Sequence, residues 1–292
     1  MRGLIITNQE IGHNKYKIDR FKEEFTKRDI SLEVFINNGT LAKIDNDKLC
    51  INLPKADFVI YLDKDIYLAR ELELAGYKLF NEANFVKLCD DKMLTNIYCS
   101  NMEIRMPKTI AAPLFYSIEL KQDNLTFLDN VINELKLPLV LKKVYGSLGT
   151  GVFLINTKEE LVQKYSEFCR EPIQFQEYIK TSYGKSVRVL IIDQQIVGAF
   201  MRVNKDDFRS NFGKTAKSEK FEIPEQFTRF ANKIAKNFQI KYAGIDVLFG
   251  ENNEPILCEI NSNAFFEEFE KITGVNVAAK FADMVIRNLK NE

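Results

Sequence analysis

Oxygen-bearing side chains gather on two neighbouring segments near the C-terminus. In CEINSN, Glu259 and Asn261 are two residues apart, so both point to the same face of an extended strand. The facing segment, AGIDVLFG, places Asp246 among apolar residues. Buried carboxylates need a partner charge, and neither segment contains Lys or Arg. Because Mg²⁺ and Mn²⁺ prefer oxygen ligands, these three side chains predict a metal site. The alternatives are salt bridges to another element and an ordinary solvated hairpin.

A glycine-rich segment, LKKVYGSLGTGV, lies between two apolar runs earlier in the chain. Its backbone amides are suited to binding phosphate oxygens, and Lys142 precedes it as a phosphate ligand. The spacing matches neither a P-loop nor a dinucleotide-binding fingerprint. An ordinary glycine-containing hairpin therefore remains the alternative. The residues concerned are Gly146, Ser147, Gly149 and Gly151.

Two further segments have polar residues that suit a nucleotide. The stretch DDFRSNFGKTA has Arg209 and Asn211 in an irregular basic loop, which is typical of a lid over phosphates. Glu177 ends the apolar run QFQE, where a carboxylate can accept a hydrogen bond from the adenine amino group. An ordinary exposed loop and an ordinary strand end are the alternatives.

Composition excludes several classes of function. The 292 residues include 41 Lys+Arg and 41 Asp+Glu, so the basic excess needed for non-specific nucleic-acid binding is absent. His13 is the single histidine, which disfavours histidine-based hydrolases. The five cysteines form no CxxC pair, and no apolar run approaches the roughly 20 residues of a membrane span. We therefore expect a cytoplasmic protein that binds neither nucleic acid nor membrane.

Apolar spacing in the first part of the chain alternates between strand and helix. Near-continuous apolar strands joined by helices predict a parallel sheet covered by helices, as one α/β domain over residues 1–82. The predicted strands are residues 3–7, 31–37, 57–62 and 77–80, and the predicted helices are residues 15–28 and 66–75.

After Pro138 the pattern changes to short strands joined by tight turns, which predicts an α+β part with antiparallel hairpins. One hairpin turn is expected at residues 193–195. Helices are predicted at residues 83–101, 127–136, 225–239 and 276–290. Strands are predicted at residues 106–110, 139–146, 151–156, 173–179, 186–193, 195–203, 243–250 and 254–263.

The order of these segments resembles that of the ATP-grasp ligases, and specifically their RimK-like α-L-glutamate ligase branch. The resemblance covers about residues 85–285 and depends on PLVLKKVYGSLGTGV, FQEYIK, DFRSN, AGIDVL, CEINSN and EKITG. It implies an ATP-grasp fold with an N-terminal α/β pre-ATP-grasp domain at residues 1–82. A central subdomain at 83–179 would contain the glycine-rich flap, and a C-terminal subdomain at 180–292 would contain the metal site.

The resemblance also implies residue roles. Lys142, Arg209 and Asn211 match catalytic positions. Asp246, Glu259 and Asn261 match magnesium ligands, with Glu259 bridging two ions, and Arg202 matches a basic residue that lines the site. The implied nucleotide-binding residues are Lys92, Lys142, Gly146, Ser147, Gly149, Gly151, Glu177, Tyr178, Ile179, Arg188, Arg209, Ser210 and Asn211.

Two positions depart from the family pattern. Ser186 stands where the family usually has aspartate, two residues before Arg188. Asn263–Phe266 replaces the usual Ser-Pro-Gly beside the acceptor pocket, so the resemblance does not fix glutamate as the substrate. On an extended segment neighbouring side chains point to opposite sides, so we expect either Phe265 or Phe266 to face the pocket and the other to join the core.

The implied activity is ATP-dependent ligation of a carboxylate to an amine through an acyl phosphate, with ATP and Mg²⁺ or Mn²⁺ as cofactors. The expected reaction adds an amino acid such as L-glutamate to a protein, peptide or small-molecule carboxylate. A dipeptide or natural-product amide ligase is the first alternative, and a nucleotide-binding regulator without turnover is the second. The sequence leaves both substrates and the oligomeric state open, a homo-oligomer included.

Overall fold

The computed structural model describes residues 1–9, 11–116, 122–213 and 215–290. Its first sheet, which we name the N-terminal sheet, is parallel with strand order β2-β1-β5-β6, as the sequence predicts. Alternate residues of the buried strand β1 face opposite sides, with Leu4 and Ile6 in one core and Ile5 in another. The strands are β1 (Arg2–Thr7), β2 (Ser31–Ile36), β5 (Phe58–Leu62) and β6 (Leu79–Phe80).

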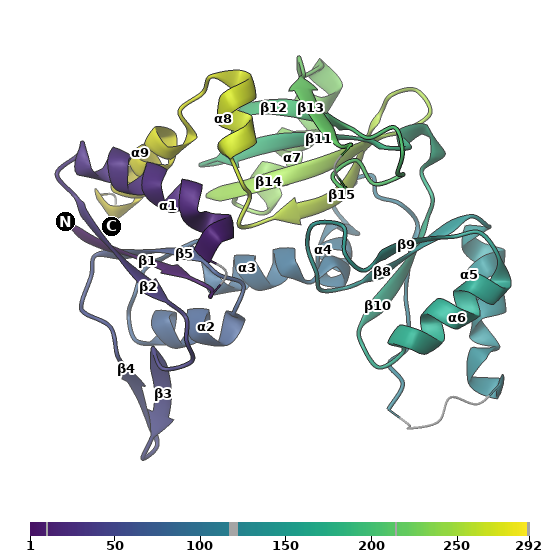
Figure 1. Ribbon diagram of the computed structural model, residues 1–292, viewed down its shortest axis with the longest axis horizontal. Coiled ribbons are helices and arrows are strands. Elements are labelled where there is room, and N and C mark those ends of the chain that lie inside the picture. Colours follow the sequence, from purple (N-terminus) through teal and green to yellow (C-terminus); the bar gives the residue numbers. More distant parts are fainter. Residues whose placement is uncertain (10, 117–121, 214, 291–292) are drawn as a thin grey trace.

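Helices cover both faces of the N-terminal sheet. Helix α2 (Ile66–Leu74) packs on the face that contains Leu4, and helix α1 (Ile11–Thr26) packs on the opposite face. An antiparallel hairpin of β3 (Ala42–Asp45) and β4 (Lys48–Ile51) extends away from the sheet (Figure 1). The sequence did not predict this hairpin, whose strands are only four residues long and largely exposed.

Residues 83–101 do not form the single helix that was predicted. They form α3 (Ala83–Asp90) and α4 (Lys92–Cys99), and Asp91 between them is extended, with ψ 97°. The Asp91 carboxylate accepts a hydrogen bond from the Leu94 backbone amide at 2.9 Å, and so caps α4. The prediction of one helix was wrong because Asp91, which caps α4, lies inside a continuous helical pattern of apolar residues.

The central sheet is antiparallel with strand order β7-β10-β8-β9. Helices α5 and α6 pack on it (Figure 1). The sequence did not predict α6, where Leu161 and Tyr165 are the buried residues in a largely charged segment. The elements are β7 (Thr109–Ala111), the short helix η1 (Gln122–Leu125), α5 (Phe127–Leu135), β8 (Leu139–Lys143), β9 (Val152–Ile155), α6 (Lys158–Phe168) and β10 (Ile173–Glu177).

The C-terminal sheet is antiparallel with strand order β13-β12-β11-β14-β15. Asp193 and Gln194 have φ angles of 52° and 61° and form the tight turn expected between β11 and β12. Strand β13 and helix α8 were not predicted. The elements are η2 (Lys180–Ser182), β11 (Lys185–Ile192), β12 (Gln195–Val203), β13 (Lys217–Lys220), α7 (Glu225–Asn237), β14 (Tyr242–Phe249), β15 (Pro255–Asn261), α8 (Glu267–Thr273) and α9 (Val277–Lys290).

The two ends of the chain share one core. Helix α9 returns to the N-terminal sheet and lies beside α1 (Figure 1). The Phe21 ring lies 4.7 Å from the Phe281 ring and 5.4 Å from the Phe266 ring, measured between centroids. The N-terminal sheet is therefore fixed to the C-terminal sheet by a continuous apolar contact. Within the described ranges, no helix is long and apolar enough to cross a membrane.

We predict that Phe281→Ala lowers the free energy of unfolding by about 3–5 kcal/mol, because it leaves a cavity where Phe281 is 2% exposed. Urea denaturation followed by circular dichroism measures this loss. Ile44→Ala is the matched control, since Ile44 is 77% exposed and its truncation should change stability by less than about 0.5 kcal/mol. Equal losses in the two variants would contradict a shared core at α9.

Candidate active site

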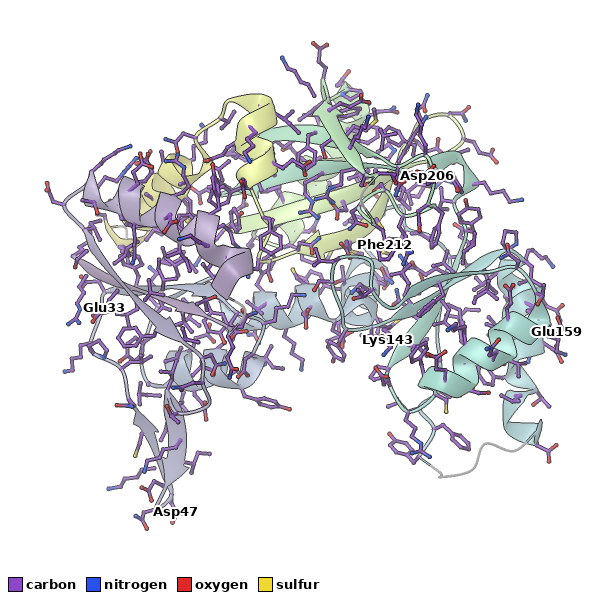
Figure 2. The ribbon with its side chains drawn as sticks, in the orientation of Figure 1. Glu33, Asp47, Lys143, Glu159, Asp206 and Phe212 are labelled. Carbon is purple, nitrogen blue, oxygen red and sulfur yellow. The ribbon has the colours of Figure 1, made fainter. Side chains whose placement is uncertain are left out.

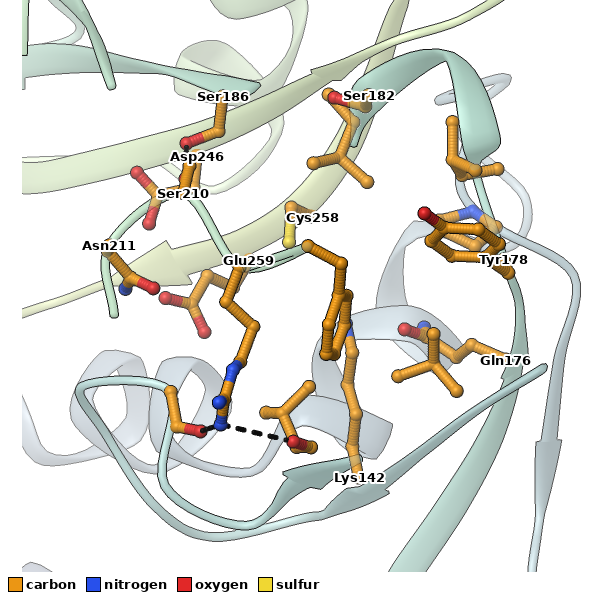
Figure 3. A pocket seen from close by; sticks show the side chains of 18 of the residues that line it. Lys142, Gln176, Tyr178, Ser182, Ser186, Ser210, Asn211, Asp246, Cys258 and Glu259 are labelled. Atoms are coloured by element: carbon orange, nitrogen blue, oxygen red, sulfur yellow. Dashed lines mark hydrogen bonds between the residues drawn. The ribbon is translucent and has the colours of Figure 1, made fainter. Parts of the chain in front are cut away.

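Two cavities meet on the C-terminal sheet. The narrow cavity, of about 120 Å³, lies between the central and C-terminal sheets, and the wide cavity, of about 360 Å³, lies between the C-terminal and N-terminal sheets. Figure 3 shows the narrow cavity with Tyr178 and Gln176 at one end and Asn211 and Glu259 at the other. The residues that line both cavities are Ser147, Arg202, Ser210, Asn211 and Glu259.

Most of the predicted site residues line these cavities. Arg188 and Asn261 line the wide cavity. Gly151 lines neither cavity, since it packs against the side chain of Lys143 at the base of the β8–β9 hairpin. The predicted residues in the narrow cavity are Lys92, Lys142, Gly146, Ser147, Gly149, Glu177, Tyr178, Ile179, Arg209, Ser210, Asn211, Asp246 and Glu259.

Lys92 holds the glycine-rich loop that joins β8 to β9. Its Nζ donates to the carbonyl of Gly146 at 2.8 Å and to that of Val144 at 3.3 Å. Burial lowers the pKa of Lys92, and the nearby carboxylate of Glu259 opposes that shift. Lys142 lies on β8 in the same cavity, so the loop is bordered by two lysine side chains.

The segment around Arg209 rests on this glycine-rich loop. Arg209 Nη1 donates to the carbonyl of Gly149 at 3.0 Å, and the guanidinium lies 3.4 Å from the centroid of the Phe212 ring. Phe212 lies between the C-terminal sheet and the loop (Figure 2). A Cβ at Gly149 would lie 3.4 Å from both Asn211 Oδ1 and Phe212 Cδ2. Glycine at this position therefore allows the two segments to approach closely.

Asp207 orients Arg209 and was not identified from the sequence. Its Oδ1 accepts from Arg209 Nε at 3.0 Å and its Oδ2 accepts from Nη2 at 2.8 Å. These hydrogen bonds lower the pKa of Asp207. The bidentate geometry fixes the plane of the guanidinium and directs Nη1 toward the glycine-rich loop. An acidic residue two positions from a basic one is too common a pattern to indicate this role.

Asp246 has a basic partner that lies on a neighbouring strand. Asp246 pairs in register with Glu259 on β15 and with Arg188 on β11. Arg188 Nη2 donates to Asp246 Oδ2 at 2.6 Å, and Arg188 Nε donates to Oδ1. The two strands considered in the sequence contain no basic residue, but the neighbouring strand supplies one. A salt bridge to another element, which the sequence left open as an alternative, therefore forms at Asp246 in this structure.

Two arginines and two carboxylates set the electrostatics of this junction. Burial raises the pKa of Asp246, but the charges of Arg188 and Arg202 outweigh burial and leave that pKa below its usual value. Arg202 Nη1 lies 3.4 Å from each carboxylate oxygen of Asp246. Burial, together with the charge of Arg188, lowers the pKa of Arg202. A further anion near Arg202 would therefore be stabilised.

The oxygen-bearing side chains predicted as metal ligands do converge. Asn261 Nδ2 donates to Glu259 Oε1 at 3.1 Å and to Asp246 Oδ2 at 3.4 Å. The described residues contain no group of three or more His, Cys, Asp and Glu side chains arranged for a metal. The amide nitrogen of Asn261 faces the two carboxylates, so the three side chains form a smaller set of hard ligands once the amide is rotated by 180°. This set fits a hard cation that takes its remaining ligands from water or a bound phosphate.

The Tyr178 end of the narrow cavity offers polar groups beside aromatic ones. The Tyr178 and Phe208 rings meet edge to face, with 6.2 Å between centroids. Gln176 Nε2 donates to Thr109 Oγ1 at 2.8 Å, while its Oε1 is buried without a partner among the described residues. Gln176 was missed because it looks like an ordinary strand residue beside Glu177. Free polar atoms beside aromatic rings suit a flat heterocycle.

The two departures from the family pattern have clear structural outcomes. The Ser186 hydroxyl lies 2.6 Å from that of Ser210, so the two side chains share a hydrogen bond. Phe265 lines the wide cavity and Phe266 is fully buried in the core, which confirms that the two rings take opposite sides.

Asn8 and Asn14 also line the wide cavity, and no local spacing in the sequence indicated them.

Comparisons with known proteins agree with this geometry. The chain is 34% identical over 256 residues to the uncharacterized protein MG012 of Mycoplasma genitalium, covering 86% of each chain. It is 27% identical over 272 residues to human N-acetylaspartylglutamate synthase A, covering 89% of this chain and 67% of that protein. The Bacillus anthracis D-alanine–D-alanine ligase complexed with ATP superposes with a TM-score of 0.74 at 18% identity, covering 100% of this chain and 98% of that one.

The family model for the RimK-like ATP-grasp domain matches residues 91–285, about two thirds of the chain. This match agrees with the parallel N-terminal sheet, the two antiparallel sheets and the site between them. The ATP-grasp resemblance inferred from the sequence is thereby confirmed. The chain belongs to the RimK-like ATP-grasp family of ADP-forming ligases.

Proposed function

We propose that this protein joins a carboxylate to an amine at the expense of ATP, through an acyl phosphate. The junction of the two cavities carries this proposal. The same five side chains line both, so a nucleotide in the narrow cavity and a carboxylate in the wide one would meet at shared residues. Arg202 and Ser210 at the junction offer hydrogen-bond donors to the group that is transferred.

The reaction has two balanced steps. A carboxylate oxygen attacks the γ-phosphorus of ATP, the bond to the bridging oxygen breaks, and ADP leaves. The amine nitrogen then attacks the acyl carbon, phosphate leaves with the electron pair of the C–O bond, and the nitrogen loses a proton. Little general-base catalysis is needed beyond deprotonation of the amine, which agrees with a chain that contains one histidine.

Asp246, Glu259 and Asn261 are the residues we propose as ligands of Mg²⁺. The cation would neutralise charge on the terminal phosphates. Because Arg188 holds the Asp246 carboxylate by both oxygens, Asp246 is oriented before any ligand binds. Glu259 lines both cavities, so among these three ligands it is the one that would lie beside both the nucleotide and the carboxylate substrate.

Lys142, Arg209 and Asn211 are the residues we propose for stabilising the transferred group. All three line the narrow cavity, and Asn211 also lines the wide one. Asp207 and the Phe212 ring hold the Arg209 guanidinium against the glycine-rich loop. A preorganised cation of this kind loses little free energy to reorganisation during the reaction.

Similarity to N-acetylaspartylglutamate synthase A favours an amino acid such as L-glutamate as the amine. We propose that the carboxylate occupies the wide cavity, where Arg202 supplies positive charge. Phe265 borders that cavity at the position where the family pattern has small residues, so the ring is expected to restrict which carboxylates enter.

We predict that Glu259→Gln lowers turnover by about 10²–10³-fold, because it removes one negative charge where the cation is held. Coupled measurement of ADP release gives the rate. Glu254→Gln is the matched control on the same hairpin, outside both cavities, and should keep the parent rate. Parent-level turnover in Glu259→Gln would refute its assignment as a metal ligand.

We predict that hydroxylamine intercepts the activated carboxylate as a hydroxamate, with ADP and phosphate formed in equal amounts. The reason is that the positively charged groups of the narrow cavity lie around the glycine-rich loop, where the terminal phosphates are proposed to bind. Chromatography of the nucleotides and colorimetry of the hydroxamate measure both. Formation of AMP and pyrophosphate instead would show an adenylate and overturn the proposed mechanism.

A further inference from the structure

Helix α8 borders the wide cavity, and its first turn contains Glu267, Glu268 and Glu270. Lys271 Nζ lies 2.7 Å from Glu267 Oε1, and Arg20 Nε lies 3.1 Å from Glu270 Oε2. Glu268 lines the cavity, and no ion pair joins it to a basic side chain within the described ranges. Two of the three carboxylates are therefore neutralised by the protein, and the third faces the cavity.

The packing of α8 fixes the direction of Glu268. The neighbouring residue, Phe269, is fully buried and meets the Phe200 ring edge to face, with 6.2 Å between centroids. A Cβ at Gly198 would lie 3.0 Å from the Phe269 ring, so the helix packs directly on β12. Successive residues of an α-helix point about 100° apart. Glu268 is accordingly exposed, at the rim of the cavity rather than in the core.

The other carboxylates of the wide cavity already have partners or roles. In the described part of the chain, the acidic residues that line it are Asp90, Glu259 and Glu268. Asp90 pairs with Lys64. Glu259 is a proposed ligand of Mg²⁺, so its charge would be neutralised by the cation. Glu268 is the carboxylate that remains available to a substrate.

Positive charge lies close to Glu268 in the same cavity. Burial lowers the pKa of Arg202, and the negative charge of Glu268 acts in the opposite direction, so the two side chains are within electrostatic range. Lys220 lies on the same face of β13 as Ser218, which lines the cavity, and makes no ion pair with Glu268 in the described structure. Arg202 lines both cavities. A group held between Glu268 and Arg202 would therefore lie near the junction.

The amine substrate must arrive as a cation and react as a neutral molecule. Aliphatic amines have pKa values of about 10 in water, so they are ammonium ions at neutral pH and have no free electron pair. A carboxylate at the rim attracts such an ion. Positive charge from Arg202 then lowers the pKa of the bound ammonium group, which favours transfer of its proton to the carboxylate.

We propose that Glu268 receives the amine substrate as an ammonium ion and accepts the proton that the nitrogen must lose before it attacks. The inference rests on the proposed function, because it assigns a residue to the second step. An N–H bond of the ammonium breaks, the proton bonds the Glu268 carboxylate, and the freed electron pair forms the bond to the acyl carbon. The nitrogen loses a second proton to the departing phosphate. Glu268 is exposed, so it returns its own proton to solvent.

Nucleophiles that differ in charge test the proposal. Hydroxylamine is uncharged at neutral pH, whereas L-glutamate and methylamine arrive as ammonium ions. The full chain is supplied with ATP, Mg²⁺ and whichever of succinate, citrate and N-acetyl-L-aspartate gives the most hydroxamate. In Glu268→Gln, the rate of amide formation with either amine, divided by the rate of hydroxamate formation, should fall about 10²-fold at neutral pH. The ratio should recover as the pH approaches about 10, because the neutral amine then forms in solution.

Glu267→Gln is the matched control, because Glu267 lies in the same helical turn, pairs with Lys271 and lines neither cavity. It should keep the parent ratio at every pH. Glu268→Ala supplies a second test. Added formate should restore amide formation in this variant, since formate replaces the missing carboxylate at the exposed rim.

Equal loss of amide and hydroxamate formation in Glu268→Gln would indicate a purely structural effect and overturn the inference. A ratio that stays at the parent value would overturn it as well. Failure of the parent chain to form hydroxamate with any of the three acids would instead overturn the proposed function, and this inference with it. The failures are distinguishable, because the first two appear only when the variant is compared with an active parent.

Discussion

The buried ion pair between Arg188 and Asp246 is the constraint on which the site depends. The side chains are 7% and 5% exposed, and the guanidinium binds both carboxylate oxygens. Removing one member of such a pair costs about 3–5 kcal/mol, because the other charge is left buried without a partner. The pair exists because β11 lies beside β14 in register, with Arg188 opposite Asp246. The order of strands in the C-terminal sheet therefore determines where the acidic cluster can form.

Loops from the other sheets complete the site around this pair. The central sheet supplies the glycine-rich loop. Lys92 bonds the Gly146 carbonyl of this loop, and Arg209 of the facing segment bonds the Gly149 carbonyl. The N-terminal sheet is fixed in place by the core that α9 shares with α1. Its strand ends then close the wide cavity, where Asn14 and Asn263 bond the same carbonyl of Leu62. The three sheets thus contribute different walls to one continuous space.

Local pattern predicted much of the fold. Long apolar strands and amphipathic helices such as α7 were identified because their periodicity is strong, and the tight turn at residues 193–195 was identified from its polar residues. Short or largely polar elements, such as β3, β13 and α6, gave no such signal. The break at Asp91 was missed because one capping residue looks the same inside a helix as at its start. The division of the chain at residues 82 and 179 stays a prediction.

The candidate site was predicted where residues lie close in sequence, and missed where strand pairing brings distant residues together. Glu259 and Asn261 share a strand, so their spacing alone indicated a common face. The partnership of Arg188 with Asp246 joins residues 58 positions apart and depends on the register of β11. Asn14 and Asn263 lie more than 200 positions apart in the sequence, and both bond the Leu62 carbonyl at the wide cavity. A single sequence contains no signal for such contacts.

The central claim is that a carboxylate oxygen becomes bonded to the γ-phosphorus at the junction of the two cavities. Labelling both oxygens of the substrate carboxylate with ¹⁸O and analysing the products of one turnover by mass spectrometry tests it directly. The account predicts one labelled oxygen in the released phosphate, one in the amide carbonyl and none in ADP. Label in a released AMP, or phosphate without label, would contradict it.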